Sequence, residues 1–454
     1  MIEKLKAILA RADADYADLR YETKRETKIS FNGPDLSHVT VSNTDGYVLR
    51  ILKGGGFSTL AFTREADAEK ALRTALENAR LIAKNSRQPV RLAAAEAVRD
   101  EFLPKLEEDP RQIGLDEKIE LTKKYNALAR SNPLIATTSI GYSETVREKH
   151  FASTEGAVVR EDLVTVGISG LITSRDGNLI QNARVAVGGS AGFQILRSRE
   201  EEFEKKKKIV LDLLKAQSVP GGVHNVILNN SLAGVFTHEA FGHFSEADLI
   251  EDNPTMRQKM HLGAKLGNDI LNIVDDPTKY GQLGFYKYDD EGIPVAAVPL
   301  LRNGVLCGRL HSRRTAAEFG EPVNGHCVAE DFGYAPIIRM GTIFITPGKD
   351  TIESLFAKLD DGLYILDAKG GQTSGENFTF GAQYGYRVKN GKVTDMVRDI
   401  NLTGNLYKTM QNITAIADDF RLTETGGCGK GQTNIRSCHG APHILVQNVV
   451  IGGK

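Results

Sequence analysis

Two histidines and a glutamate in one short segment give this chain its clearest chemical signature. His238, Glu239 and His243 form an H-E-x-x-x-H pattern within the stretch NNSLAGVFTHEAFGHFSEAD. Neutral imidazoles are common zinc ligands, and a neighbouring glutamate can act as a general base toward water. These residue types therefore point to metal-dependent hydrolysis. The alternative interpretation is two unrelated histidines on a partly buried helix.

The spacing of the two histidines makes a demand on the backbone. In the better-known zinc-peptidase pattern the histidines are four residues apart and share one helix face. A separation of five turns the second side chain by about 140° around a regular α-helix, so both rings could not face one ion. A π-turn would align them, and Gly242 lowers the cost of that distortion. We therefore predict a helix over residues 231–246, capped by Asn230 or Ser231, with a widened turn between the histidines.

A catalytic zinc ion needs a third protein ligand and one position left for water. An adjacent histidine–cysteine pair in extended chain points to opposite faces, so it does not readily give both groups to one metal. Spacing alone does not decide among the candidates. They are Glu246 or Asp248 on the following turn, Cys428 in TGGCGKGQT, and the adjacent pairs His326-Cys327 and Cys438-His439. The two acidic candidates could instead accept a hydrogen bond from a histidine Nδ1–H, or have ordinary capping or surface roles.

Positive and polar side chains also gather in the stretch GRLHSRR. They could hold a peptide carboxylate or an oxyanion, and a solvated strand edge fits the pattern equally well. The sequence leaves the role of these residues open. They are Arg309, His311, Arg313 and Arg314.

Four motifs together resemble the TldD branch of the TldD/PmbA metallopeptidase family. They are THEAFGHFSEADL, GRLHSRRTAAEFGEPVNGH, IIRMGTIFITPGKDTIE and GGCGKGQ, and the similarity extends over essentially the whole chain. The resemblance implies that zinc is held by His238, His243 and Cys428. It also implies that Glu239 is the catalytic carboxylate. The PmbA branch lacks this metal-binding set, whereas every member is present here.

The resemblance also implies an activity and a partner. The expected activity is zinc-dependent hydrolysis of peptide bonds in small or unfolded peptides, with Glu239 as general base. TldD-like chains pair with PmbA-like (TldE) chains in a heterodimer, and a homodimer would be the substitute. We expect a dimer whose zinc faces an enclosed cavity.

Two alternative functions remain. One is a catalytically silent scaffold of the PmbA type that binds peptides or partners, and another is a metal hydrolase acting on a non-peptide amide.

Composition argues against nucleic-acid-binding, membrane-spanning and disulfide-rich classes of protein. Lys and Arg number 57 against 58 Asp and Glu, a formal charge of -1, so no polybasic surface is expected for nucleic acid or anionic lipid. Four cysteines in 454 residues are too few for a disulfide framework and favour a reduced, cytoplasmic compartment. No window reaches 18 uninterrupted apolar residues, so no membrane span is expected.

The elements that must position the motif follow from periodicity and turn signals. Helical spacing predicts helices over residues 2–17, 66–82, 116–130 and 199–216. Alternating stretches predict strands, with hairpin turns at Asn32-Gly33, Asp45-Gly46, Asn303-Gly304 and Asn390-Gly391. The turn sequence STEG at residues 153–156 echoes NTDG at residues 43–46, so an internal duplication is one interpretation; a shared turn preference explains the echo as well.

Chain length and a proline–glycine segment that interrupts regular structure predict the domain organisation. A chain of 454 residues is about three times a typical domain, and Pro220-Gly221-Gly222 marks the predicted boundary. The expected fold class is α+β. Residues 1–220 would form a domain of helices and antiparallel sheet, with subdomains at about 1–85 and 116–219. Residues 221–454 would form a strand-rich domain that holds the metal-site helix.

Overall fold

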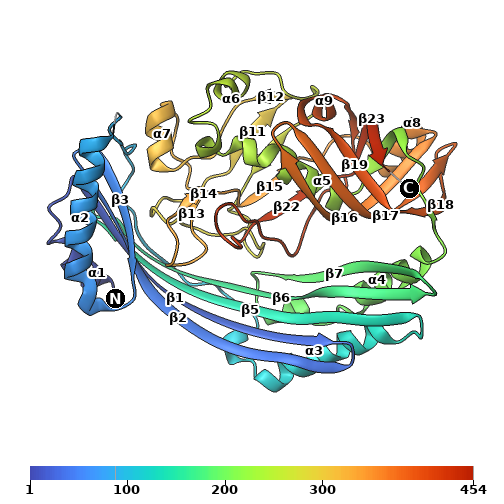
Figure 1. Ribbon diagram of the computed structural model, residues 1–454, viewed down its shortest axis with the longest axis horizontal. Coiled ribbons are helices and arrows are strands. Elements are labelled where there is room, and N and C mark those ends of the chain that lie inside the picture. The colour runs from blue at the N-terminus through green and yellow to red at the C-terminus, as the bar shows by residue number, and fades with distance from the viewer. Residues whose placement is uncertain (87, 453–454) are drawn as a thin grey trace.

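A curved, seven-stranded sheet with very long strands forms one side of the molecule (Figure 1). The computed structural model describes residues 1–86 and 88–452. The strand order is β3-β2-β1-β5-β6-β4, and β7 also pairs with β6. Pairing is antiparallel except between β4 and β6. The strands are β1 (Tyr16–Asn32), β2 (Asp35–Lys53), β3 (Gly56–Phe62), β4 (Arg99–Phe102), β5 (Ile135–Ser153), β6 (Val158–Asp176) and β7 (Leu179–Gly189).

Four helices bury their apolar stripes against this sheet. α2 packs on β2 and β3, while α3 and α4 pack on each other and on β5 and β7. The first helix is shorter than predicted and ends at Leu9, because Tyr16 already begins β1 and is buried there. The others lie within a few residues of their predicted bounds. The helices are α1 (Ile2–Leu9), α2 (Ala68–Asn85), α3 (Leu115–Arg130) and α4 (Glu200–Leu213), with short 3-10 turns at Glu65–Asp67, Pro110–Gln112 and Phe193–Leu196.

One predicted turn is wrong. Asp45-Gly46 lies inside β2, not at its end. A Cβ added at Gly46 would lie 2.2 Å from the ring of Phe332, so the glycine makes room for a side chain from the C-terminal half of the chain. The echo between NTDG and STEG therefore does not mark equivalent places, since STEG follows β5 as a true turn.

The other three hairpin predictions are confirmed. The turn Gly33-Pro34, directly after Asn32, joins β1 to β2, while Asn303-Gly304 joins β11 to β12 and Asn390-Gly391 joins β17 to β18. All three glycines have positive φ, and Asn303 and Asn390 share that backbone conformation at φ +50°. Asparagine followed by glycine is the pair that tolerates this conformation best, which explains why local sequence sufficed here.

An eight-stranded sheet dominates the C-terminal half of the chain. Its order is β16-β9-β23-β19-β17-β18-β8, with β20 also on β23, and β16 pairs in addition with β17. The pairing of β16 with both β9 and β17 closes a ring of five strands. The strands are β8 (Gln217–Ser218), β9 (Gly222–Leu228), β16 (Gly362–Ser374), β17 (Asn377–Lys389), β18 (Lys392–Arg398), β19 (Ile400–Asn405), β20 (Ile413–Ile416) and β23 (Ile444–Gly452).

A six-stranded sheet lies beside it, in the order β12-β11-β10-β15-β22-β21. It consists of β10 (Ile273–Asp275), β11 (Val298–Arg302), β12 (Val305–Leu306), β15 (Thr342–Ile345), β21 (Arg421–Leu422) and β22 (Cys438–Ala441). One buried apolar cluster draws side chains from both sheets. The remaining elements are β13 (Cys327–Val328), β14 (Ile337–Ile338), α5 (Asn230–Phe236), α6 (Pro254–Lys259), α7 (Arg313–Phe319), α8 (Ile352–Leu359) and α9 (Leu406–Gln411).

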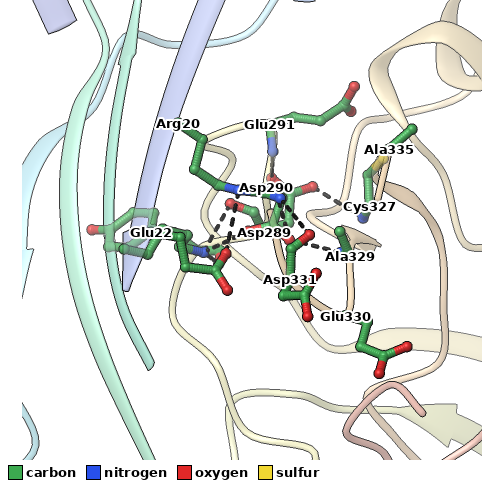
Figure 2. Close-up of polar contacts among 12 residues, drawn as sticks. Arg20, Glu22, Asp289, Asp290, Glu291, Cys327, Ala329, Glu330, Asp331 and Ala335 are labelled. Atoms are coloured by element: carbon green, nitrogen blue, oxygen red, sulfur yellow. Dashed lines mark hydrogen bonds and ion pairs between the residues drawn. The ribbon is translucent and has the colours of Figure 1, made fainter. Parts of the chain in front are cut away.

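Buried charges join the curved sheet to the C-terminal half (Figure 2). Asp290 Oδ2 lies 3.0 Å from Arg20 Nη1 and 3.3 Å from Arg147 Nη2, while its Oδ1 lies 3.2 Å from Lys149 Nζ. Burial alone would raise the pKa of Asp290, but Arg147, Arg20 and Lys149 together lower it. The loop before β11 is therefore held against β1 and β5 by ion pairs. The interface cluster comprises Arg20, Glu22, Arg147, Lys149 and Asp290.

The predicted α+β class is confirmed, with helices and mainly antiparallel sheets along the whole described chain. Strands from residues 1–85 and 116–219 share one sheet, because β1 pairs with β5. The division at residue 220 and the two subdomains stay predictions. No helix among the described residues combines the length and the apolar character that a membrane crossing needs.

Candidate metal centre

The helix that carries the histidines starts where β9 ends. Its N-cap is Asn229, whose side chain accepts a hydrogen bond from the Leu232 N–H at 3.0 Å. The predicted cap at Asn230 or Ser231 is therefore off by one residue. The amide of Asn230 instead donates to the Ala441 carbonyl at 2.9 Å, which ties the helix start to β22.

The predicted widening between the histidines is present. α5 passes into a π-helix over Thr237–Phe241, followed by a 3-10 turn over Gly242–Ser245. The rings of His238 and His243 consequently lie close together, with centroids 5.3 Å apart and ring planes at 87°. Gly242 has an ordinary helical φ of -55°, so conformational freedom is not its role. A Cβ there would lie 2.1 Å from the sulfur of Met340, so the glycine allows close packing.

Cys428 reaches the histidines from a loop far along the chain. Its backbone exchanges two 3.0 Å hydrogen bonds with Ile435, which closes the glycine-rich loop. A Cβ at Gly427 would lie 2.0 Å from the Asn434 side chain, so glycine is needed beside the thiol. Cys428 Sγ then lies 3.4 Å from His243 Nε2.

Four side chains converge here, and their potential ligand atoms all lie within 4.8 Å of one another. A tetrahedral zinc bound to one imidazole and one thiolate separates nitrogen and sulfur by about 3.6 Å, close to the distance seen here. His238 Nδ1 is buried and has no hydrogen-bond partner within the described residues, as expected of a nitrogen reserved for another ligand. The residues therefore fit a zinc ion. The donor cluster comprises His238, Glu239, His243 and Cys428.

Burial dominates the protonation of this cluster. Burial, with His439, His243 and Arg339 nearby, lowers the pKa of His238, so its imidazole is neutral and free to bind a metal. Burial raises the pKa of the Glu239 carboxyl, with His243 and Arg339 opposing that rise. Burial opposes charge on His243, but hydrogen bonds with Cys428 and Glu246 raise its pKa to about 10.

A buried carboxylate orients the second histidine. Glu246 is fully buried, and its Oε2 lies 3.1 Å from His243 Nδ1, which leaves Nε2 facing Cys428. Lys430 Nζ lies 3.0 Å from the same oxygen and donates to Asp248 at 2.6 Å. Glu246 and Asp248 therefore stand behind the cluster, and Lys430 ties the Cys428 loop to the helix. Carboxylates in such positions fix the orientation of metal-binding histidines.

The two adjacent histidine–cysteine pairs do not join the cluster. His326 is buried between Asn324 and Asp275, with Nε2 3.2 Å from Asp275 Oδ1. The Cys438 thiol donates to the Thr423 carbonyl at 2.9 Å. His439 alone comes near, with its ring centroid 5.7 Å from that of His238.

The cationic stretch GRLHSRR proves to be structural. Arg309 and His311 both contact Glu321, Arg313 pairs with Glu155 at 2.8 Å, and Arg314 pairs with Glu251 at 2.7 Å. Arg309, His311 and Arg313 are also buried. Neither of the two roles left open by the sequence fits, because the three arginines form ion pairs that connect parts of the chain.

Two basic residues near the centre escape sequence reasoning. Lys430 lies in GGCGKGQ and Arg339 in IIRMGT, so membership of those motifs was the only available signal. Arg339 is fully buried, and its Nη1 lies 3.9 Å from Glu246 Oε1. Its three guanidinium nitrogens have no hydrogen-bond partner within the described residues.

Known proteins resemble this chain along its whole length. A metalloprotease of Synechocystis sp. is 34% identical over 446 residues, covering 98% of this chain and 96% of that protein. A zinc metalloprotease TldD homolog of Saccharolobus solfataricus is 28% identical over 453 residues, covering 97% of each.

Solved structures share the fold at lower identity. The crystal structure of TldE from Thermococcus kodakarensis superposes with a TM-score of 0.80 at 18% identity, covering 100% of this chain and 99% of that one. A Thermotoga maritima protein described as a modulator of a DNA gyrase gives a TM-score of 0.82 at 20% identity, covering 99% of each chain.

Three consecutive parts of the chain match one family. Residues 17–83 match the PmbA/TldA metallopeptidase domain 1, residues 108–218 the central domain, and residues 221–453 the C-terminal domain. The resemblance carried by the four motifs is thus confirmed. The chain belongs to the PmbA/TldD family of metallopeptidases.

Proposed function

We propose that this protein is a zinc-dependent peptidase that hydrolyses peptide bonds in small or unfolded peptides. The observation that carries the proposal is the donor cluster, in which two imidazoles, a thiol and a carboxylate meet within 4.8 Å beside a cavity of about 830 Å³. Relatives named as metalloproteases support the reaction class, and one of them is named as a zinc enzyme.

In this proposal His238, His243 and Cys428 hold the zinc. A zinc ion held there would lower the pKa of a water molecule and polarise the carbonyl of the peptide bond. The protein keeps His238 neutral by burial and fixes His243 through Glu246. His238 can thereby donate a lone pair, whereas a metal bound at His243 would have to displace the proton that the raised pKa of this histidine favours.

Glu239 supplies the proton transfers. Its carboxylate lines the larger cavity, and its Oε2 lies 3.9 Å from His243 Nε2, at the side of the proposed ligands. It takes the proton of the attacking water and returns it to the departing amine nitrogen. Burial keeps its pKa above the ordinary glutamate value, which makes the carboxylate a better base.

We further propose a cytoplasmic dimer, formed with a PmbA-like (TldE) chain or with a second copy of this chain. All four cysteines are free thiols, as a reducing compartment would keep them. An enclosing partner would keep folded proteins away from the metal. Light scattering tests the assembly, and an active monomer with an open site contradicts it.

The substitution Glu239→Gln tests the proposed reaction. It removes the base and leaves the ligands, so we expect hydrolysis of an unfolded peptide to fall by about 100- to 10,000-fold with bound zinc unchanged. Glu353→Gln, an exposed glutamate on α8, is the matched control. Full activity of Glu239→Gln would eliminate this base. If the wild-type protein binds zinc but cleaves no peptide, the alternative of a catalytically silent scaffold is favoured. If it cleaves only non-peptide amides, the alternative of a metal hydrolase with such substrates is favoured.

A further inference from the structure

Two cavities meet at the loop that carries Cys428. The larger, of about 830 Å³, contains Glu239, and the smaller, of about 380 Å³, lies between the curved sheet and the C-terminal half. Arg184, Glu424, Thr425 and Gly426 line both. Residues 424–426, just before Cys428 in sequence, thus line both cavities, and Glu239 lines the larger one.

Two of the five carboxylates lining the larger cavity pair with a lysine or an arginine. Glu424 pairs with Arg199 at 2.6 Å, Asp367 pairs with Lys206, and Asp419 contacts His443 Nδ1 at 2.6 Å. Within the described residues, Glu239 and Asp419 have only histidines as ion-pair partners, and Glu202 has none. The remaining basic side chains have no carboxylate within ion-pair distance in the described part of the chain; they are Arg184, Lys205, Lys369 and Arg421.

The smaller cavity holds one further uncompensated cation. Arg436 makes a single side-chain hydrogen bond, to the Ser190 hydroxyl at 2.5 Å, and its buried Nε has no partner within the described residues. Burial lowers its pKa to about 10, Arg147 adds to this effect, and Glu161, which also pairs with Lys149, opposes it. A guanidinium this poorly compensated is costly unless an anion reaches it.

Other charged groups lining the smaller cavity already have partners. Lys24 contacts Asp331 and Glu26, while Arg147 and Lys149 belong to the interface cluster. The carboxylate of Glu330 accepts hydrogen bonds from the backbone of Thr433 and Asn434. Arg184 and Arg436 are thus the cations of this cavity that lack a carboxylate partner within the described residues.

We propose that these cavities select peptides that carry carboxylate groups, and that the smaller cavity is a carboxylate-binding subsite whose uncompensated cations are Arg436 and Arg184. The inference rests on the proposed peptidase function and adds its substrate class. Guanidinium groups bind carboxylates through paired N–H donors. The carboxylate can come from a Glu or Asp side chain or from the C-terminus of the peptide.

Matched peptides test the preference. One unfolded peptide sequence is made with internal Glu or with Gln in its place, and each form with a free or an amidated C-terminus. For the zinc-loaded enzyme we expect kcat/KM to be roughly tenfold or more higher for a carboxylate form than for the neutral form. Preference for Glu over Gln assigns the subsite to side chains, and preference for the free C-terminus assigns it to the terminal carboxylate.

Substitutions locate the subsite. Arg436→Gln and Arg184→Gln should each remove most of the preference, while Arg302→Gln, an exposed arginine outside both cavities, should leave it intact. Arg184 is exposed, so its Gln variant keeps the test decisive if Arg436→Gln does not fold.

A binding measurement separates this inference from the proposed reaction. The Glu239→Gln protein, with no cleavage needed, should bind a fluorescent Glu peptide or free-acid peptide roughly tenfold more tightly than its Gln, amidated form, measured by anisotropy at low salt. If no peptide is cleaved but this difference persists, the reaction is wrong and the subsite stands. Equal affinities and equal kcat/KM for charged and neutral peptides would overturn the subsite.

Discussion

Two buried polar clusters in this protein differ in whether their charged and polar atoms have partners within the fold. In the interface cluster, Arg20, Arg147 and Lys149 face Glu22 and Asp290, and Lys149 also pairs with Glu161, so cations and carboxylates balance. In the donor cluster, His238 Nδ1 has no partner within the described residues, and the other ligand atoms face one another.

The contrast separates structural from functional burial. A buried charge that pairs with an opposite charge in the fold holds two parts of the chain together. Potential metal-ligand atoms that converge on one point, one of them without a partner, instead suggest a site for a ligand. Loss of a partner should therefore unfold the protein at the first cluster and release metal at the second. Three substitutions test this distinction.

The largest effect is expected in the interface cluster. Asp290→Asn leaves three cations facing Glu22 and Glu161 alone, and breaking such a buried network should lower the free energy of unfolding by about 3–5 kcal/mol. Denaturant titration measures it. Asp395→Asn, an exposed aspartate on β18, should change it by less than about 0.5 kcal/mol. A loss below 1 kcal/mol for Asp290→Asn would remove the structural half of the comparison.

The next effect is expected at the thiol. Cys428→Ser replaces a thiolate ligand with a hydroxyl that binds zinc poorly, so zinc affinity should fall more than the roughly 100-fold typical of lost outer contacts, and activity with it. The fold should persist. Chelator competition gives the affinity, and Cys307→Ser, at an exposed cysteine, should retain full zinc. Wild-type zinc affinity in Cys428→Ser would exclude this residue as a ligand.

A smaller effect is expected behind the histidine. Glu246→Gln keeps the shape but weakens the contact to His243 Nδ1, so zinc affinity should fall by about 10- to 100-fold. Glu353→Gln serves as the control. Unchanged affinity would mean that the imidazole is positioned by packing alone. If Glu246→Gln instead lowers the free energy of unfolding as much as we expect for Asp290→Asn, then Glu246 has a structural role like that of the interface cluster.

Sequence reasoning predicted the widened turn between the histidines correctly because the constraint was local. Five-residue spacing between His238 and His243 required a widened turn whatever the rest of the fold, and the π-helix over Thr237–Phe241 provides it. The choice of Cys428 over Glu246 was not local. It came from the family resemblance, since nothing in the spacing of a residue so distant in sequence fixes its position.

Failures share one physical cause, which is contact with distant residues. The local sequence of Asp45-Gly46 favours a turn, but in the fold the ring of Phe332 occupies the space beside Gly46. The cations in GRLHSRR look available until Glu155 and Glu251 pair with Arg313 and Arg314. Local propensity cannot report partners that only folding brings together.

Zinc-edge anomalous diffraction from crystals of the purified protein tests the central claim most directly. We expect one zinc per chain, about 2.0–2.1 Å from a nitrogen of His238 and of His243 and about 2.3 Å from Cys428 Sγ, with Glu239 outside the ligand set. A zinc peak elsewhere, or a zinc-loaded crystal in which Cys428 does not coordinate the ion, would contradict the account.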